Sequence, residues 1–118
     1  MTIKYSNKKV MEICTDSKAA TKLLGAVVYR KLFALIYSLE EANNLSFLMH
    51  MSRYRLHQLV GDRKDQYSLV IHSSSKYRLI IYPMDSDGNI IEAKENENER
   101  LIQTVMVEIL EVSEHYDK

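Results

Sequence analysis

The sequence predicts one α+β domain, in which a small antiparallel-rich sheet has helices packed on one face. Two strand-like runs, 67–72 and 77–82, are rich in β-branched and aromatic residues and are joined by three serines, as a hairpin requires. A long helical pattern fills much of the first 42 residues. A chain of 118 residues is large enough for one modest hydrophobic core, so we expect a single domain over 1–118.

The amino-terminal third is expected to form a strand and two helices. Residues 2–6 have a strand pattern, and Ser6 or Asn7 can cap a helix over 8–14. A break at 15–17 then starts a second helix over 18–42, the longest element. One face of this helix is apolar at a period of 3.6 residues and is expected to pack on the core: Leu24, Val28, Leu32, Leu35 and Leu39.

A second, aromatic stripe on the same long helix consists of Tyr29, Phe33 and Tyr37. These residues recur every four positions, so they share a helix face. Two interpretations remain open for this stripe. It packs in the core, or it docks a partner protein.

The rest of the chain supplies a short helix, a turn and a last strand. A short helix is expected over 45–51, and residues 84–89 are typical of a turn because they contain Asp, Gly and Asn. The glutamate-rich segment 90–104 is expected to be a solvated excursion. Residues 101–112 are expected to form an interior strand, because they are apolar on both faces. The two faces would be Val105, Val107 and Ile109 against Met106, Leu110 and Val112.

Charge is distributed unevenly along a chain whose net charge is zero. Residues 1–91 carry 13 Lys and Arg against 8 Asp and Glu, whereas residues 92–118 carry 3 against 8. Zero net charge does not favour strong non-specific binding to nucleic acids. However, several cations crowd into one span with only two aspartates among them: Arg53, Arg55, Arg63, Lys64, Lys76 and Arg78.

The single cysteine, Cys14, excludes an internal disulfide and a cysteine-based zinc cluster, and its amphipathic surroundings favour a small buried hydrophobe. The four histidines are scattered without a metal-binding spacing, so we expect no metal and no cofactor. Neither a signal peptide nor an apolar run of membrane-spanning length is present, and we expect a cytoplasmic protein that does not associate with membranes.

Arg78 lies in the middle of the second strand-like run. By strand alternation it points to the same side as Ile80 and Tyr82, opposite its two chain neighbours. An unpaired guanidinium is costly to bury. Arg78 therefore either pairs with an internal carboxylate, for which Glu114 is the candidate, or lines a pocket for an anion.

Four short motifs occur in order from Arg55 to Ile80: R-L-H at 55–57, L-V-G-D-R-K at 59–64, Q-Y-S at 66–68 and Y-R-L-I at 77–80. Together they resemble the RelE/ParE superfamily of bacterial toxins from type II toxin–antitoxin pairs, most closely the HigB-type branch. That branch usually ends in an acidic-Tyr-His motif after the last strand. Here Glu114 matches the acidic position, while His115 and Tyr116 are exchanged in order. The resemblance implies a RelE-like fold, a twisted sheet with two amino-terminal helices on one face.

The resemblance further implies cleavage of messenger RNA, often on the ribosome, with the substrate's own 2′-hydroxyl as the nucleophile. Such cleavage needs a base, an acid and cations around the phosphate. The candidate catalytic residues are Arg78, His57, His115, Tyr116 and Glu114. The candidate substrate-binding residues are Arg55, Arg63, Lys64 and Lys76. Taken singly, each residue also has a structural interpretation: a buried Arg78–Glu114 pair, a solvated corner at 63–64, a core or capping His57, and fraying at 115–116.

Two other functions remain open. One is a non-enzymatic inhibitor of DNA gyrase, as in the ParE-type branch, and the other is a degenerate relative that only binds an antitoxin-like partner. The partners implied for the nuclease are mRNA, the ribosome and a cognate antitoxin, usually a helix-turn-helix protein. The aromatic stripe is a candidate docking surface for that antitoxin.

Overall fold

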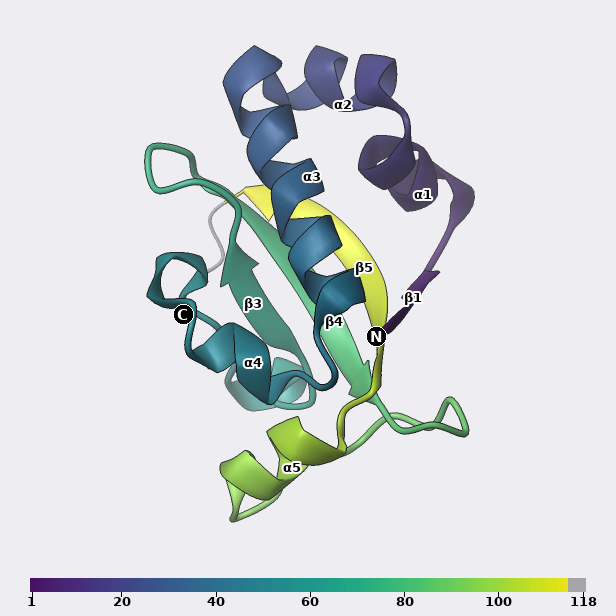
Figure 1. The fold of residues 1–118 in the computed structure, drawn as a ribbon, viewed down its shortest axis with the longest axis vertical. Coiled ribbons are helices and arrows are strands. Elements are labelled where there is room, and N and C mark those ends of the chain that lie inside the picture. Colours follow the sequence, from purple (N-terminus) through teal and green to yellow (C-terminus); the bar gives the residue numbers. More distant parts are fainter. Residues whose placement is uncertain (115–118) are drawn as a thin grey trace.

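A computed structural model describes residues 1–114, which form a twisted five-stranded sheet with helices on one face (Figure 1). The sheet order is β1 (Thr2–Tyr5), β5 (Met106–Glu114), β4 (Tyr77–Met84), β3 (Tyr67–Val70) and β2 (His57–Gln58). The β1 strand runs parallel to β5, and all other neighbours in the sheet are antiparallel. The predicted α+β class and the β3–β4 hairpin are therefore confirmed.

Helices cover one face of this sheet (Figure 1). They are α1 (Lys8–Thr15), α2 (Ser17–Leu24), α3 (Ala26–Glu41) and α4 (Ser46–Met49). The 3₁₀ turns η1 (Ser52–Tyr54) and η2 (Gly61–Arg63) follow α4 along the chain, and α5 (Glu97–Gln103) precedes β5. The predicted leucine stripe is confirmed, because Leu32, Leu35 and Leu39 are fully buried against the sheet. Cys14 also lies in this core, where burial raises the pKa of its thiol to about 12 and leaves it unreactive.

Side-chain caps start the first two helices, as the sequence predicts. The Asn7 side chain accepts a hydrogen bond from the backbone N–H of Val10 at 2.9 Å, and Asp16 accepts one from Lys18 at 2.9 Å. The single long helix expected over 18–42 is wrong, however, because Gly25 divides it into α2 and α3. Gly25 has φ 87° and ψ 168°, a conformation that is open mainly to glycine.

Replacing Gly25 by alanine is expected to destabilise the protein by about 1–2 kcal/mol, because a Cβ is strained at positive φ even though no atom lies within 4 Å of it. Urea denaturation of both proteins measures the difference. An increase in the free energy of unfolding would contradict the helix break at Gly25. In an uninterrupted helix, the same substitution stabilises by roughly 1 kcal/mol.

The segment 90–104 is not the solvated excursion that its charge suggests. It contains α5, whose Arg100 and Leu101 are 0% and 1% exposed, and the following Thr104 is 0% exposed. The helix starts at a cap, because the Asn96 side chain accepts from the N–H of Glu99 at 3.1 Å. The last strand accordingly begins at Met106, five residues later than predicted.

Arg100 is the residue that fixes α5 to the sheet and to the loop after η2. Its Nε donates to the carbonyl of Ile91 at 2.9 Å, and its Nη2 donates to the carbonyl of Asp65 at 2.9 Å. Its Nη1 lies 3.2 Å from Glu97, and its guanidinium stacks 4.9 Å from the centre of the Tyr67 ring. The Tyr67 hydroxyl donates to the same Glu97 carboxylate at 3.0 Å, and burial raises the pKa of this phenol.

The interior position of β5 is confirmed, but its predicted faces are only half right. Its register with β4 shifts between Ile80 and Ile81, and Leu110 is the extra residue of this bulge. The expectation that Val112 faces away from Val107 is therefore wrong, since both contact the helix-side core. Beyond the bulge, it is Glu111 that faces away from the helices.

Within the described residues, no helix has the length and apolar character needed to cross a membrane.

Candidate functional site

The sheet face turned away from helices α1–α4 gathers several polar side chains, and we call it the distal face. Its members follow from the register, because residues directly opposite one another on paired strands share a face. Tyr77, Leu79 and Ile81 contact the helix-side core, so Arg78 points the other way, as predicted. The distal face comprises His57, Ser68, Val70, Arg78, Ile80, Tyr82, Glu108, Glu111 and Ser113.

Arg78 stands at the hairpin end of this face and is half-buried. Its Nη1 donates to the carbonyls of Ser75 and Tyr77, both at 3.1 Å. These two bonds hold the guanidinium against the hairpin turn.

The predicted pair of Arg78 with Glu114 does not fit the register. Ser113 lies opposite Arg78, whereas Glu114 lies opposite Tyr77, on the helix side of the sheet. There, burial and a hydrogen bond with Glu114 raise the pKa of the Tyr77 phenol. The placement of Glu114 as a partner of the catalytic groups is therefore corrected.

Arg63 reaches over the distal face from η2 and is not the solvated corner of the structural interpretation. Its Nε donates to the Gln66 side chain at 2.8 Å, and Gln66 donates to the Tyr82 hydroxyl at 3.3 Å. Its Nη2 lies 3.6 Å from a carboxylate oxygen of Glu111. The bulge in β5 makes this contact possible, because it turns Glu111 to the distal face. The neighbouring Lys64 is exposed.

His57 lies on the edge strand β2, half-buried, with its Nδ1 at 2.9 Å from the carbonyl oxygen of Arg55. A carbonyl only accepts hydrogen bonds, so Nδ1 carries the proton of this pair. The neutral ring then has its basic lone pair on Nε2. Arg55 itself has φ 44°, which is rare for a residue with a side chain, and strain of this kind clusters at functional sites.

The register of the sheet sets the distance between the backbones of His57 and Arg78. His57 pairs with Ser68 and Ser68 with Ile80, so His57 lies two strands from β4 and two residues from Arg78 along it. At about 4.8 Å between strands and about 3.3 Å per residue, the two Cα atoms are about 12 Å apart. Arg63 contacts Glu111, which lies opposite Ile80 on the same face.

Four residues of this site were not predicted as functional: Gln66, Ser68, Tyr82 and Glu111. Gln66 and Ser68 belong to the Q-Y-S motif, which is the sequence signal that could have marked them as functional residues. Ser68 is fully buried, and its hydroxyl has no hydrogen-bond partner in the part of the chain that the structure describes. Glu111 had no local signal, because only the bulge places it here.

A pocket of about 350 Å³ adjoins Arg78 at the hairpin end of the sheet. We call it the arginine pocket, and it is lined by Ser52, Arg53, Arg55, Val70, Ser73 and Arg78. The predicted residue Arg55 thus lines a cavity, whereas Lys76 is exposed on the hairpin beside it. His115 and Tyr116 lie outside the described residues.

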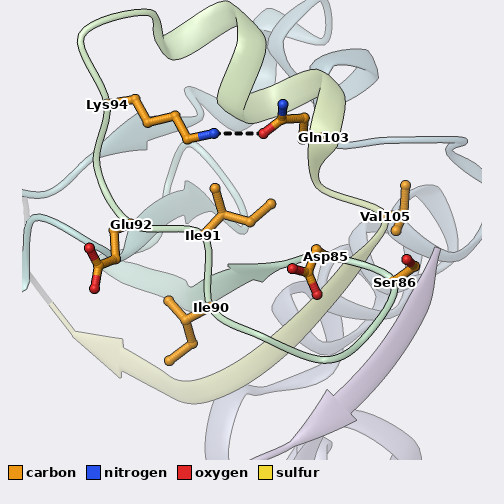
Figure 2. Close-up of a pocket in the computed structure, with 8 residues that line it drawn as sticks. All are labelled: Asp85, Ser86, Ile90, Ile91, Glu92, Lys94, Gln103 and Val105. Atoms are coloured by element: carbon orange, nitrogen blue, oxygen red, sulfur yellow. Dashed lines mark hydrogen bonds between the residues drawn. The ribbon is translucent and has the colours of Figure 1, made fainter.

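A larger, more open pocket of about 670 Å³ lies at the other end of β4 (Figure 2). It mixes apolar residues such as Ile91 with two carboxylates, and its Lys94 donates to Gln103 at 2.7 Å. The carboxylate of Asp85 accepts from two backbone N–H groups of the 84–89 turn, at 2.9 and 3.0 Å, which confirms that turn. None of the predicted site residues lines this pocket.

The aromatic stripe on α3 is divided between the core and the surface. Tyr29 and Phe33 contact the core and each other edge to face, with ring centres 5.6 Å apart. Tyr37 is 63% exposed and lines a groove of about 310 Å³ with Phe47 and Met51. Core packing therefore accounts for the first two residues, and partner docking stays a prediction for Tyr37.

Comparison with known proteins does not assign this arrangement. No protein-family model matches the chain, and no curated protein matches it. Among residues 1–114, no group of three or more His, Cys, Asp or Glu is placed to hold a metal ion.

Proposed function

We propose that the chain is a metal-independent endoribonuclease that cleaves messenger RNA on the ribosome, the toxin of a bacterial type II toxin–antitoxin pair. The observation that carries the proposal is the position of Arg63, Arg78 and His57 on one face of the sheet. Two guanidinium groups and an imidazole are suited to a phosphodiester, because arginine matches the geometry of phosphate and imidazole transfers protons near neutral pH.

Each group has a distinct task in the proposed reaction. The 2′-hydroxyl of the substrate attacks the adjacent phosphorus, and the 5′-oxygen of the next nucleotide leaves and takes a proton from solvent water. His57 Nε2 accepts the proton of the 2′-hydroxyl, while its Nδ1–H remains bonded to the Arg55 carbonyl and fixes the ring. Arg78 and Arg63 stabilise the negative charge that builds up on the phosphate oxygens. The products are a 2′,3′-cyclic phosphate and a 5′-hydroxyl.

The resemblance of residues 55–80 to HigB-type toxins supports the same proposal from sequence. The neutral total charge favours a substrate that is delivered by the ribosome over free RNA, whose binding depends on neutralising many phosphates. A cytoplasmic location and a small helix-turn-helix antitoxin complete the proposal.

Expression in bacteria with mapping of transcript ends tests this function. Growth arrest with cuts inside codons is the expected result. Arrest with DNA damage and intact transcripts would instead identify a gyrase inhibitor, and the absence of arrest in any host would identify a relative that only binds a partner. Either of these two outcomes would contradict the nuclease.

A further inference from the structure

The two ends of the long axis of the molecule carry opposite charges. Residues 8–31, which form α1, α2 and the first turns of α3, contain six Lys and Arg against two Asp and Glu. Residues 85–103, which end with α5, contain two Lys and Arg against six Asp and Glu. Figure 1 shows α2 and α5 at opposite ends of the molecule, so the two regions cannot contact each other within one copy of the chain.

The positive end contains a groove of about 560 Å³ between α1 and α2. Each of these helices contributes three side chains at positions i, i+3 and i+4, which share one helix face. They are Lys9, Glu12 and Ile13 from α1, and Ala19, Lys22 and Leu23 from α2. Leu23 is 43% exposed, and neither Lys9 nor Lys22 forms an ion pair within residues 1–114. The groove therefore combines exposed apolar surface with two cations.

The negative end presents a helix face of matching character. Glu99 and Ile102 are three positions apart on the exposed side of α5, whereas Arg100 is buried on the other side. Ile102 is 58% exposed, and Glu99 has no ion pair in the described part of the chain. The hydrogen bonds of Arg100 hold this short helix in place, so its exposed face is organised in advance and loses less entropy on binding.

We infer that α5 of one copy docks into the α1–α2 groove of a second copy, so that the chain associates head to tail. In this contact Ile102 covers Leu23, and Glu99 lies beside Lys22. An amphipathic helix in an apolar groove is a recurrent mode of protein recognition. A second copy supplies both the apolar side chain and the negative charge, whereas a phosphate backbone would use the lysines and leave the apolar lining exposed.

The overall charge and the placement of the two surfaces agree with this contact. A net charge of zero leaves no overall repulsion between copies. Because the two surfaces are different patches of the same chain, the contact is heterologous, and each copy can use both of them. Neither surface contains a residue of the proposed nuclease site, so the inference goes beyond the proposed function and does not depend on it.

Sedimentation equilibrium of the full chain tests the contact at protein concentrations from about 10 µM to about 1 mM, because α5 is short and small contacts are weak. The average mass of the wild type is expected to rise with concentration. Two charge reversals, Lys22→Glu and Glu99→Lys, each place like charges in the contact and are expected to weaken association by about tenfold or more. Lys31→Glu is the matched control, because Lys31 is also an exposed lysine but lies on α3 outside the groove. It is expected to associate as the wild type does.

A mixture of the two weakened variants identifies the contact. In an equimolar mixture of Lys22→Glu and Glu99→Lys, the unchanged α5 of the first variant meets the unchanged groove of the second, so association is expected to recover. A mixture that associates no better than its separate components would overturn the inference. A wild type that stays monomeric over the whole range would overturn it too, as would equal association of Lys22→Glu and Lys31→Glu.

Discussion

Replacing Arg78 by alanine is expected to slow cleavage of ribosome-bound mRNA by about 10²–10³-fold, the usual effect of removing one group that stabilises transition-state charge. The reason is its place at the hairpin end of the distal face, where two carbonyls hold the guanidinium next to the proposed position of the phosphate. The rate is measured in a reconstituted translation system with purified components. Thermal unfolding of the variant shows whether the fold is kept.

Two further variants make the Arg78 result specific. Arg78→Lys keeps the charge but loses the planar fork, so its rate is expected to fall between those of the wild type and Arg78→Ala. Arg30→Ala removes an exposed arginine from the helix side and is expected to leave the rate unchanged. An Arg78→Ala protein that cleaves as fast as Arg30→Ala would show that Arg78 plays no part in the chemistry.

Replacing Arg100 by methionine is expected to cost about 3 kcal/mol of folding free energy, because Arg100 is fully buried and its loss leaves carbonyl groups without their donor. The change leaves the Tyr67 hydroxyl and the carbonyls of Ile91 and Asp65 without their cation, and it leaves Glu97, whose side chain is 34% exposed, without its ion pair. Urea denaturation measures the loss. Lys94→Met is the control, because Lys94 is exposed in the same segment, and its loss is expected to cost at most about 1 kcal/mol.

A double variant tests whether the network is the cause. Adding Glu97→Gln to Arg100→Met removes the carboxylate that was left alone, so the double variant is expected to be more stable than the sum of the two single effects. If the destabilisation of the double variant equals the sum of the two single effects, Arg100 and Glu97 are not coupled, which would contradict the network as the cause. Because Arg100 also holds the Asp65 carbonyl, the loop that carries Arg63 is expected to loosen in both Arg100 variants.

The parts that could be predicted from sequence are those with a local pattern. The hairpin, the leucine stripe of α3 and the face of Arg78 follow from periods of 2.0 and 3.6 residues, which need no knowledge of the rest of the chain. The helix break at Gly25 was missed because an isolated glycine inside a helical pattern is compatible with a continuous helix. The sequence alone does not distinguish a glycine within a continuous helix from a glycine that ends a helix with a positive φ.

The parts that were missed depend on contacts between distant segments. Arg100 lies in a stretch whose glutamates suggest solvent, and only its contacts with Asp65, Tyr67 and Ile91 explain its burial. The bulge at Leu110 arises from the pairing of β5 with β4, so the strand itself predicts Glu111 on the wrong face. For the candidate site, the sequence pointed to the cations Arg63 and Arg78, but it gave no reason to expect the contacts of Arg63 with Gln66 and Glu111.

A single atom of the substrate tests the central claim, that the distal face holds a phosphodiester while the neighbouring 2′-hydroxyl attacks it. The cut made by the wild-type protein in ribosome-bound mRNA is first mapped, and the mRNA is then made again with a 2′-deoxynucleotide on the 5′ side of that cut. We predict that cleavage at this position disappears, and that the unmodified mRNA yields 2′,3′-cyclic phosphate and 5′-hydroxyl ends. Continued cleavage of the deoxy-substituted mRNA at the same bond would contradict the account, because it would require a nucleophile other than the substrate's own hydroxyl.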